Sequence, residues 1–177
     1  MPRFIALLRA VNVGKRKLPM AQLRAMAAEL GWSAAETYIQ SGNLVFTASG
    51  SAGDLEAKLE AAIAKRFGFH SDVMIRSAAQ WRSLVRANPF EREAEKEPNR
   101  VLAGLPKAPL PGGAAAALAE KAGGGERVAQ AGGGLWFHYP QGVGRSKLTP
   151  ALIDRLAGSP VTARNWRTLL TLQEMVE

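Results

Sequence analysis

Apolar positions in the first half of the chain recur with two periods, one typical of strands and the other of helices. Two segments carry apolar residues three or four positions apart, which predicts amphipathic helices over residues 19–30 and 53–67. Short β-prone runs around them predict strands at residues 3–9, 37–40, 44–47 and 73–76. The middle two strands are separated by Ser41-Gly42-Asn43, and glycine and asparagine tolerate the positive φ of a tight hairpin turn. The predicted order is βαββαβ, the ferredoxin-like pattern.

The same order recurs in the second half, after a connecting helix over residues 78–87 and an acidic, proline-bounded segment. The expected elements are a strand at 100–105, a helix at 113–122, strands at 127–130 and 135–139, a helix at 150–157, a strand at 161–163 and a last helix at 165–176. The sequence therefore predicts an α+β protein with two tandem ferredoxin-like (βαββαβ) subdomains, each with an antiparallel sheet. We assign residues 1–88 to the first subdomain with the connecting helix, 89–98 to an acidic linker and 99–177 to the second subdomain with the terminal helix.

Composition limits the chemistry that the chain can perform. The 177 residues include no cysteine, which excludes disulfides, thiolate nucleophiles and cysteine-ligated metals. No apolar run reaches the roughly eighteen residues of a membrane span, and the first run is too short for a signal peptide, so we expect a cytoplasmic protein with no membrane partner. The net charge is +8, and the first 30 residues contain six basic residues and one acidic residue. This distribution favours an anionic partner.

Three polar, glycine-containing segments stand where simple turns would be enough. They are rich in hydrogen-bond donors and poor in carboxylates, and they lie at residues 9–17, at 38–43, and at 144–147 together with 162–166. Residues 144–147 are followed by Thr149-Pro150, which resembles the start of a helix. A basic, glycine-containing loop ahead of a helix N-terminus is suited to binding phosphate. The order Gly-Lys-Ser/Thr of a P-loop is absent, so a nucleoside triphosphatase is not favoured.

The predicted topology brings these segments together in pairs. In a βαββαβ unit the loop after the first strand and the hairpin between the middle strands lie at the same end of the sheet, and so do the loop after the third strand and the exit of the fourth. We expect a small anionic ligand, phosphate- or carboxylate-bearing, in a cleft between the subdomains. The expected ligand-binding residues are Arg9, Asn12, Gln40, Ser41, Asn43, Ser146, Lys147, Arg164 and Asn165.

The same segments resemble a known family. Leu-Leu-Arg-Ala-Val-Asn-Val-Gly at residues 7–14 and Gly-Arg-Ser-Lys-Leu-Thr at 144–149, together with residues 19–20, 37–43 and 162–168, resemble the DUF1697 family of bacterial proteins of unknown function. Ala10 stands where that family commonly has glycine. The resemblance covers nearly the whole chain and implies two ferredoxin-like subdomains in a bacterial cytosolic protein, but it implies no activity, cofactor or catalytic residue.

Other function classes remain open at this point. His70 and His138, the only histidines, are far apart in sequence, so no metal site is predicted. The motif loops hold no paired carboxylates, so if the protein is an enzyme it depends on Arg, Lys, Asn and backbone donors. A nucleic-acid-binding protein is one alternative, because some ferredoxin-like domains recognise RNA, although residues 44–47 lack the glycine-aromatic pattern of that class. A protein-interaction module that uses the Ala/Gly-rich second unit is another.

Overall fold

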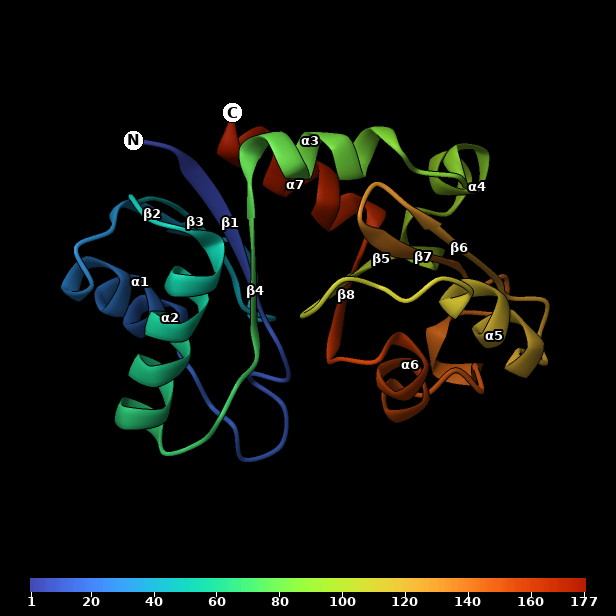
Figure 1. Ribbon diagram of the computed structural model, residues 1–177, viewed down its shortest axis with the longest axis horizontal. Helices are drawn as coiled ribbons and strands as arrows, with labels where there is room; N and C mark the ends of the chain where they lie inside the picture. The colour runs from blue at the N-terminus through green and yellow to red at the C-terminus, as the bar shows by residue number, and fades with distance from the viewer. The chain divides into compact units, whose positions relative to one another are not determined.

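Two four-stranded antiparallel sheets organise the chain, as the sequence predicts (Figure 1). The computed structural model describes residues 1–177. The first sheet has the order β2-β3-β1-β4 and the second has the order β6-β7-β5-β8. The strands are β1 (Arg3–Leu8), β2 (Ser33–Thr37), β3 (Asn43–Thr47), β4 (Val73–Ser77), β5 (Val101–Pro106), β6 (Arg127–Ala131), β7 (Gly134–His138) and β8 (Val161–Asn165). This arrangement confirms the two tandem βαββαβ units.

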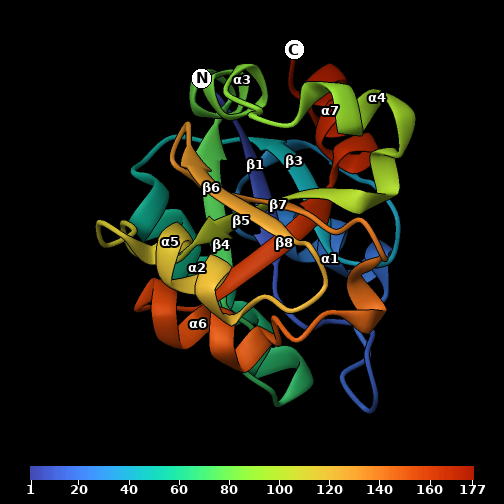
Figure 2. The same ribbon diagram turned by 90° about the vertical axis from the view of Figure 1, so that its right-hand side faces the viewer.

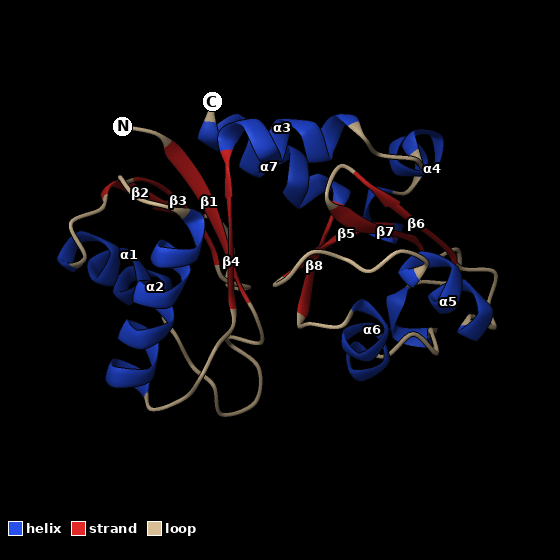
Figure 3. Ribbon diagram, viewed as in Figure 1, coloured by secondary structure: helices blue, strands red, loops and turns tan.

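Two helices cover one face of the first sheet, α1 (Met20–Glu29) and α2 (Ala52–Phe67) (Figure 3). The N-cap residue of α2 is Ser51, whose hydroxyl accepts the Asp54 N–H at 3.2 Å. The apolar side chains of the two helices pack on alternate strand residues, among them Phe4, Ala6 and Leu8 of β1. The buried side chains are therefore those that the helix and strand spacings of apolar residues predict.

The second sheet is built in the same way, with α5 (Ala114–Lys121) and α6 (Pro150–Ala157) on one side of it (Figure 2). The N-cap of α6 is Thr149, whose hydroxyl accepts the Leu152 N–H at 3.2 Å, and Pro150 is its first residue. The core beneath these helices includes Leu118, Leu135 and Phe137.

The chain divides into two compact units, Met1–Trp81 with Leu172–Glu177 and Arg82–Thr171. The divisions fall inside the connecting helix α3 (Ala78–Arg86) and the C-terminal helix α7 (Trp166–Val176). None of the helices combines the length and the apolar character that crossing a membrane requires.

Two segments differ from the prediction. The stretch expected as an acidic linker is largely helical, with α4 (Glu91–Lys96) followed by a short 3₁₀ turn, η1 (Pro98–Arg100). Ala94 of this helix is buried and Glu93 pairs with Arg127. The second strand ends at Thr37 and does not begin there: its last pair with β3 is Thr37 with Leu44, and the chain beyond it turns at Ile39, which has a left-handed φ of 50°.

A carboxylate from a helix accepts a backbone N–H of an edge strand in both units. Glu56 of α2 accepts the Ile75 N–H of β4 at 2.9 Å, and Asp154 of α6 accepts the Val161 N–H of β8 at 3.0 Å. Unpaired N–H groups on an edge strand favour pairing with another chain, so each carboxylate protects an edge of its sheet.

Candidate functional site

Three loops meet at one end of the first sheet. They are the loop after β1 (residues 9–19), the β2–β3 loop (38–42) and the segment that leads into β4 (68–72). The strand register causes this meeting, because Leu7 lies opposite Asn43 and Leu8 lies opposite Val73. The predicted proximity of the first two loops is thereby confirmed, and the third loop joins them.

Asn12 ties the first two loops together. Its side-chain Nδ2 donates to the carbonyl oxygens of Leu18, at 3.0 Å, and Gln40, at 2.6 Å. Its Oδ1 accepts the Leu18 N–H at 2.9 Å. The Asn12 amide therefore serves to hold the loops in place.

Asn43 plays a comparable part within the β2–β3 loop. It is fully buried, and its Nδ2 donates to the Tyr38 carbonyl oxygen at 2.9 Å and to the Ser41 hydroxyl at 3.1 Å. The adjacent Gly42 carbonyl oxygen accepts the Leu8 N–H at 2.9 Å, which extends the pairing of β1 into the loop. The exposed polar side chain of this loop is that of Gln40, with Ser41 half-buried beside it.

Backbone strain is concentrated at this end of the sheet. Three of the four non-glycine residues with a positive φ lie here: Ala10, Asn12 and Ile39, with φ values of 54°, 56° and 50°; the fourth is Ala34 in β2. Such conformations cost about 1–3 kcal/mol each and persist where the surrounding structure enforces them, often at functional sites. Ile39 is also 51% exposed, so burial of its side chain does not account for the strain.

Replacing Ala10 by glycine is expected to stabilise the protein by about 0.5–1 kcal/mol, because glycine adopts a left-handed φ without the steric cost that a Cβ imposes. Urea unfolding monitored by circular dichroism measures the change. The matched control is Ala57→Gly in the exposed face of α2, which should destabilise by about 1 kcal/mol. Destabilisation by Ala10→Gly would contradict the assignment of strain.

The cations of the first loop differ in their surroundings. The Arg16 side chain is used within the unit: its Nε donates to the Ala10 carbonyl oxygen at 2.7 Å, its Nη2 donates to the His70 carbonyl oxygen, and its guanidinium lies 4.7 Å from the centre of the Phe69 ring. Lys15 and Lys17 are exposed, and Arg9 is half-buried. The backbone of Arg9 is fixed, because its N–H donates to the Asp72 carbonyl oxygen at 2.9 Å and its carbonyl oxygen accepts the Ser71 hydroxyl at 2.7 Å.

A cluster that the sequence reasoning missed lies in the third loop and the helix before it. Glu60, His70 and Asp72 place three potential ligand atoms within 4.8 Å of one another. The sequence does show His70 and Asp72 two residues apart, shortly after the predicted helix that carries Glu60. That Glu60 is the helix residue facing them is evident only from the fold.

In the second unit, Ser146 and Lys147 lie beside the segment that leads into β6. Backbone N–H groups of Glu126 and Gly124 hold the pKa of the Glu126 carboxyl below its ordinary value, and the Ser146 hydroxyl contributes to the same shift. The Gly124 N–H donates to Glu126 at 2.8 Å. Lys147 is exposed, and its stem passes close to Gly123. One donor of this loop, the Ser146 hydroxyl, is thus already directed at a carboxylate of the chain itself.

Arg164 and Asn165 lie in β8, at the other edge of that sheet from β6. Arg164 is only 8% exposed and donates to the Thr162 hydroxyl at 2.8 Å and to the Ala163 carbonyl oxygen at 3.0 Å, and burial lowers the pKa of its guanidinium to about 10. The Asn165 Oδ1 caps α7 by accepting the Thr168 N–H at 3.0 Å. Strands β7 and β8 end at the same end of the sheet, as predicted. The Ser146 hydroxyl interacts with Glu126, the residue before β6, and with the Leu148 N–H, whereas the Arg164 hydrogen bonds given above run to residues of β8.

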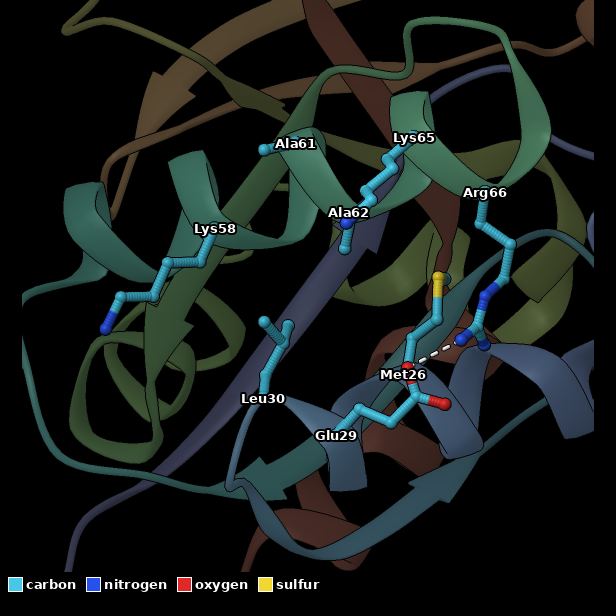
Figure 4. A pocket seen from close by; sticks show the side chains of 8 residues that line it. All are labelled: Met26, Glu29, Leu30, Lys58, Ala61, Ala62, Lys65 and Arg66. Carbon is cyan, nitrogen blue, oxygen red and sulfur yellow. Dashed lines mark hydrogen bonds and ion pairs between the residues drawn. The ribbon is translucent and has the colours of Figure 1, made fainter.

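A groove of about 600 Å³ lies between α1 and α2 (Figure 4). An ion pair of 2.5 Å between Glu29 and Arg66 spans the groove. The other side chains that line it include the apolar Met26, Leu30 and Ala62 and the basic Lys58 and Lys65. None of the site residues predicted from the sequence lines this groove. The groove and the strained loops are therefore separate features of the first unit.

Two aromatic side chains of the sheets, one in each unit, are fully buried. Phe46 of β3 and Trp136 of β7 have no exposed surface, and the Trp136 indole N–H donates to the Ala131 carbonyl oxygen at 3.1 Å. Ferredoxin-like RNA-binding domains stack bases on exposed aromatic rings of the sheet. Neither ring is placed for that role.

Comparisons with known proteins agree with this fold. A family model described as "Protein of unknown function (DUF1697)" matches residues 1–136, which confirms the family indicated by the motif segments. Among solved structures, the chain is similar to the conserved bacterial protein SP0830 from Streptococcus pneumoniae, at 24% sequence identity and a TM-score of 0.78, with 99% of each chain covered. At this identity the similarity supports the fold alone. A search of curated proteins found no match.

Proposed function

The chain belongs to the DUF1697 family, whose description names no activity, and we propose from the geometry of the first unit that it binds a small anionic ligand at the end of the first sheet. The observation that carries the proposal is the pair of strained loops, residues 9–17 and 38–43, locked to each other by Asn12. Rigid, strained loops that present cations are typical of ligand sites.

The residues divide between contact and support. Arg9, Gln40 and Ser41 are the proposed ligand contacts, with the exposed Lys15 and Lys17 adding positive charge. Asn12 and Asn43 position them through the hydrogen bonds described above. The N-cap residue of the following helix α1 is Pro19, which offers no side-chain cap, so the positive end of the helix dipole adds to the attraction for an anion. Arginine suits phosphate or carboxylate because its planar group donates two parallel hydrogen bonds.

A thermal-shift screen tests the proposal, with inorganic phosphate, di- and tricarboxylates, sugar phosphates and nucleotides as probes. A ligand present at a hundredfold its dissociation constant adds about 2.7 kcal/mol to stability. For any probe that binds, Arg9→Lys should weaken binding by about 1–3 kcal/mol, because lysine keeps the charge but loses the two-pronged hydrogen bonding. The control is Arg167→Lys on the exposed side of α7, which should bind as the parent protein does.

Two results would overturn the proposal. One is that no anionic probe stabilises the protein. The other is that Arg9→Lys binds the active probe normally while its melting temperature falls, which would make Arg9 a structural residue. Binding of a single-stranded RNA probe that weakens steeply with salt, with no response to the small anions, would instead favour the nucleic-acid alternative.

A further inference from the structure

One imidazole and two carboxylates converge beside the loops of the first unit, on residues that the proposed anion site does not use. The His70 Nε2 lies 2.9 Å from the Asp72 Oδ1 and 3.7 Å from the Glu60 Oε2. All three ligand atoms lie within 4.8 Å of one another. The His70–Asp72 distance is that of a hydrogen bond, but the His70–Glu60 distance is too long for one. Hydrogen bonding therefore explains why Asp72 lies close to His70 but does not explain why Glu60 does.

The two separations from His70 are close to those between neighbouring ligand atoms of one metal ion. Zinc holds nitrogen and oxygen ligands at about 2.0–2.2 Å, so neighbouring ligand atoms around the ion stand about 3.0–3.5 Å apart. The two distances from His70 lie on either side of that range, and small rotations of the side chains bring them into it. The neutral imidazole can carry its proton on Nδ1, which leaves the Nε2 lone pair for a metal.

The elements that carry the three residues are held in place. Glu60 lies on α2, a helix of 16 residues capped at both ends. The His70 carbonyl oxygen accepts from Arg16, the Ser71 hydroxyl donates to the Arg9 carbonyl oxygen at 2.7 Å, and the Asp72 carbonyl oxygen accepts the Arg9 N–H at 2.9 Å. A metal site needs this kind of support, because ligands on a fixed backbone lose little entropy on binding.

We propose that Glu60, His70 and Asp72 form a binding site for a divalent first-row transition metal, with zinc as its representative. An imidazole among the ligands favours such ions over magnesium and calcium, which prefer oxygen ligands alone. The two carboxylates balance the charge of a divalent cation in a chain that is otherwise strongly basic. The His70 side chain is 64% exposed, so an ion can enter from solvent, and three protein ligands leave coordination positions for water or an anionic group.

Isothermal titration of the chelator-treated protein with ZnCl₂ tests the site, with thermal unfolding as the second measurement. We expect one equivalent of zinc to bind and to raise the melting temperature. The substitutions His70→Gln, Asp72→Asn and Glu60→Gln should each weaken zinc binding roughly tenfold or more, as expected for the loss of a group that the metal site requires. Each is nearly isosteric, and none lies in the apolar core.

The matched control is His138→Gln, which removes the other histidine of the chain and should leave the zinc affinity unchanged. The proposal is overturned if the parent protein binds no zinc in a saturable manner, or if zinc binds as tightly to the His70→Gln variant. It is also overturned if Glu60→Gln leaves the affinity unchanged, because the site then lacks its third ligand. The outcome is independent of the anion proposal, since zinc is the probe here and no anionic ligand is added.

Discussion

Replacing Glu56 by alanine is expected to lower the free energy of unfolding by about 2–4 kcal/mol, because the carboxylate serves two groups at once. It accepts the Ile75 N–H of the edge strand at 2.9 Å, and it lies 3.9 Å from the Arg76 guanidinium. Burial lowers the pKa of Arg76 and Glu56 opposes that shift, so removing Glu56 makes the buried positive charge more costly. Urea unfolding of the parent and variant proteins measures the difference.

The variant Glu56→Gln separates the two contributions. Glutamine retains an oxygen for the Ile75 N–H but removes the negative charge beside Arg76, so an intermediate loss is expected. Asp154→Ala, at the corresponding contact of the second unit, should cost about 1–2 kcal/mol for the loss of the acceptor at Val161. If Glu56→Ala changes stability by no more than about 0.5 kcal/mol, as exposed substitutions usually do, the contact contributes nothing measurable.

The order of the elements was predictable from sequence because each helix and strand buries one regular set of side chains. The helix residues Leu23, Met26, Leu55 and Leu59 are buried, as their spacing indicates. The second strand was placed too late, because its end depends on where pairing with β3 stops, after Thr37, and a β-branched residue such as Ile39 gives no warning of the left-handed φ in the loop that follows. The acidic segment was taken for a linker because its composition is hydrophilic, whereas a single small apolar residue, Ala94, is enough to pack that short helix.

The candidate site was predictable only in part. Topology alone places the loops after β1 and between β2 and β3 together. It does not say which polar groups are already engaged, because an asparagine amide can serve a ligand or the backbone equally well. Asn12 and Asn43 bind the backbone, and Arg16 spans to the third loop. The cluster of Glu60, His70 and Asp72 depends on how the end of α2 faces the loop that follows, which no local pattern encodes.

Replacing Gly42 by alanine is expected to destabilise the protein by about 2–4 kcal/mol and to disturb the loops of the proposed anion site. Gly42 has a φ of 89°, where a Cβ is strained whatever the surrounding space. An added Cβ would also lie 2.7 Å from the Val11 Cγ2 and 2.8 Å from the Leu8 Cβ. Strain of about 1 kcal/mol and a forced displacement of about 1–3 kcal/mol together give the expected loss.

The control is Gly14→Ala in the neighbouring loop, where φ is also positive, at 55°, but nothing lies within 4 Å of the added Cβ. This variant should lose only about 1 kcal/mol, the cost of the backbone conformation alone. Urea unfolding compares the two, and amide hydrogen exchange at Leu8, whose N–H donates to the Gly42 carbonyl oxygen at 2.9 Å, reports on the loop. Exchange at Leu8 should accelerate in Gly42→Ala and remain unchanged in Gly14→Ala. If the two variants lose equal free energies of unfolding, the contacts of the added Cβ with Leu8 and Val11 cost nothing beyond the strain of a positive φ.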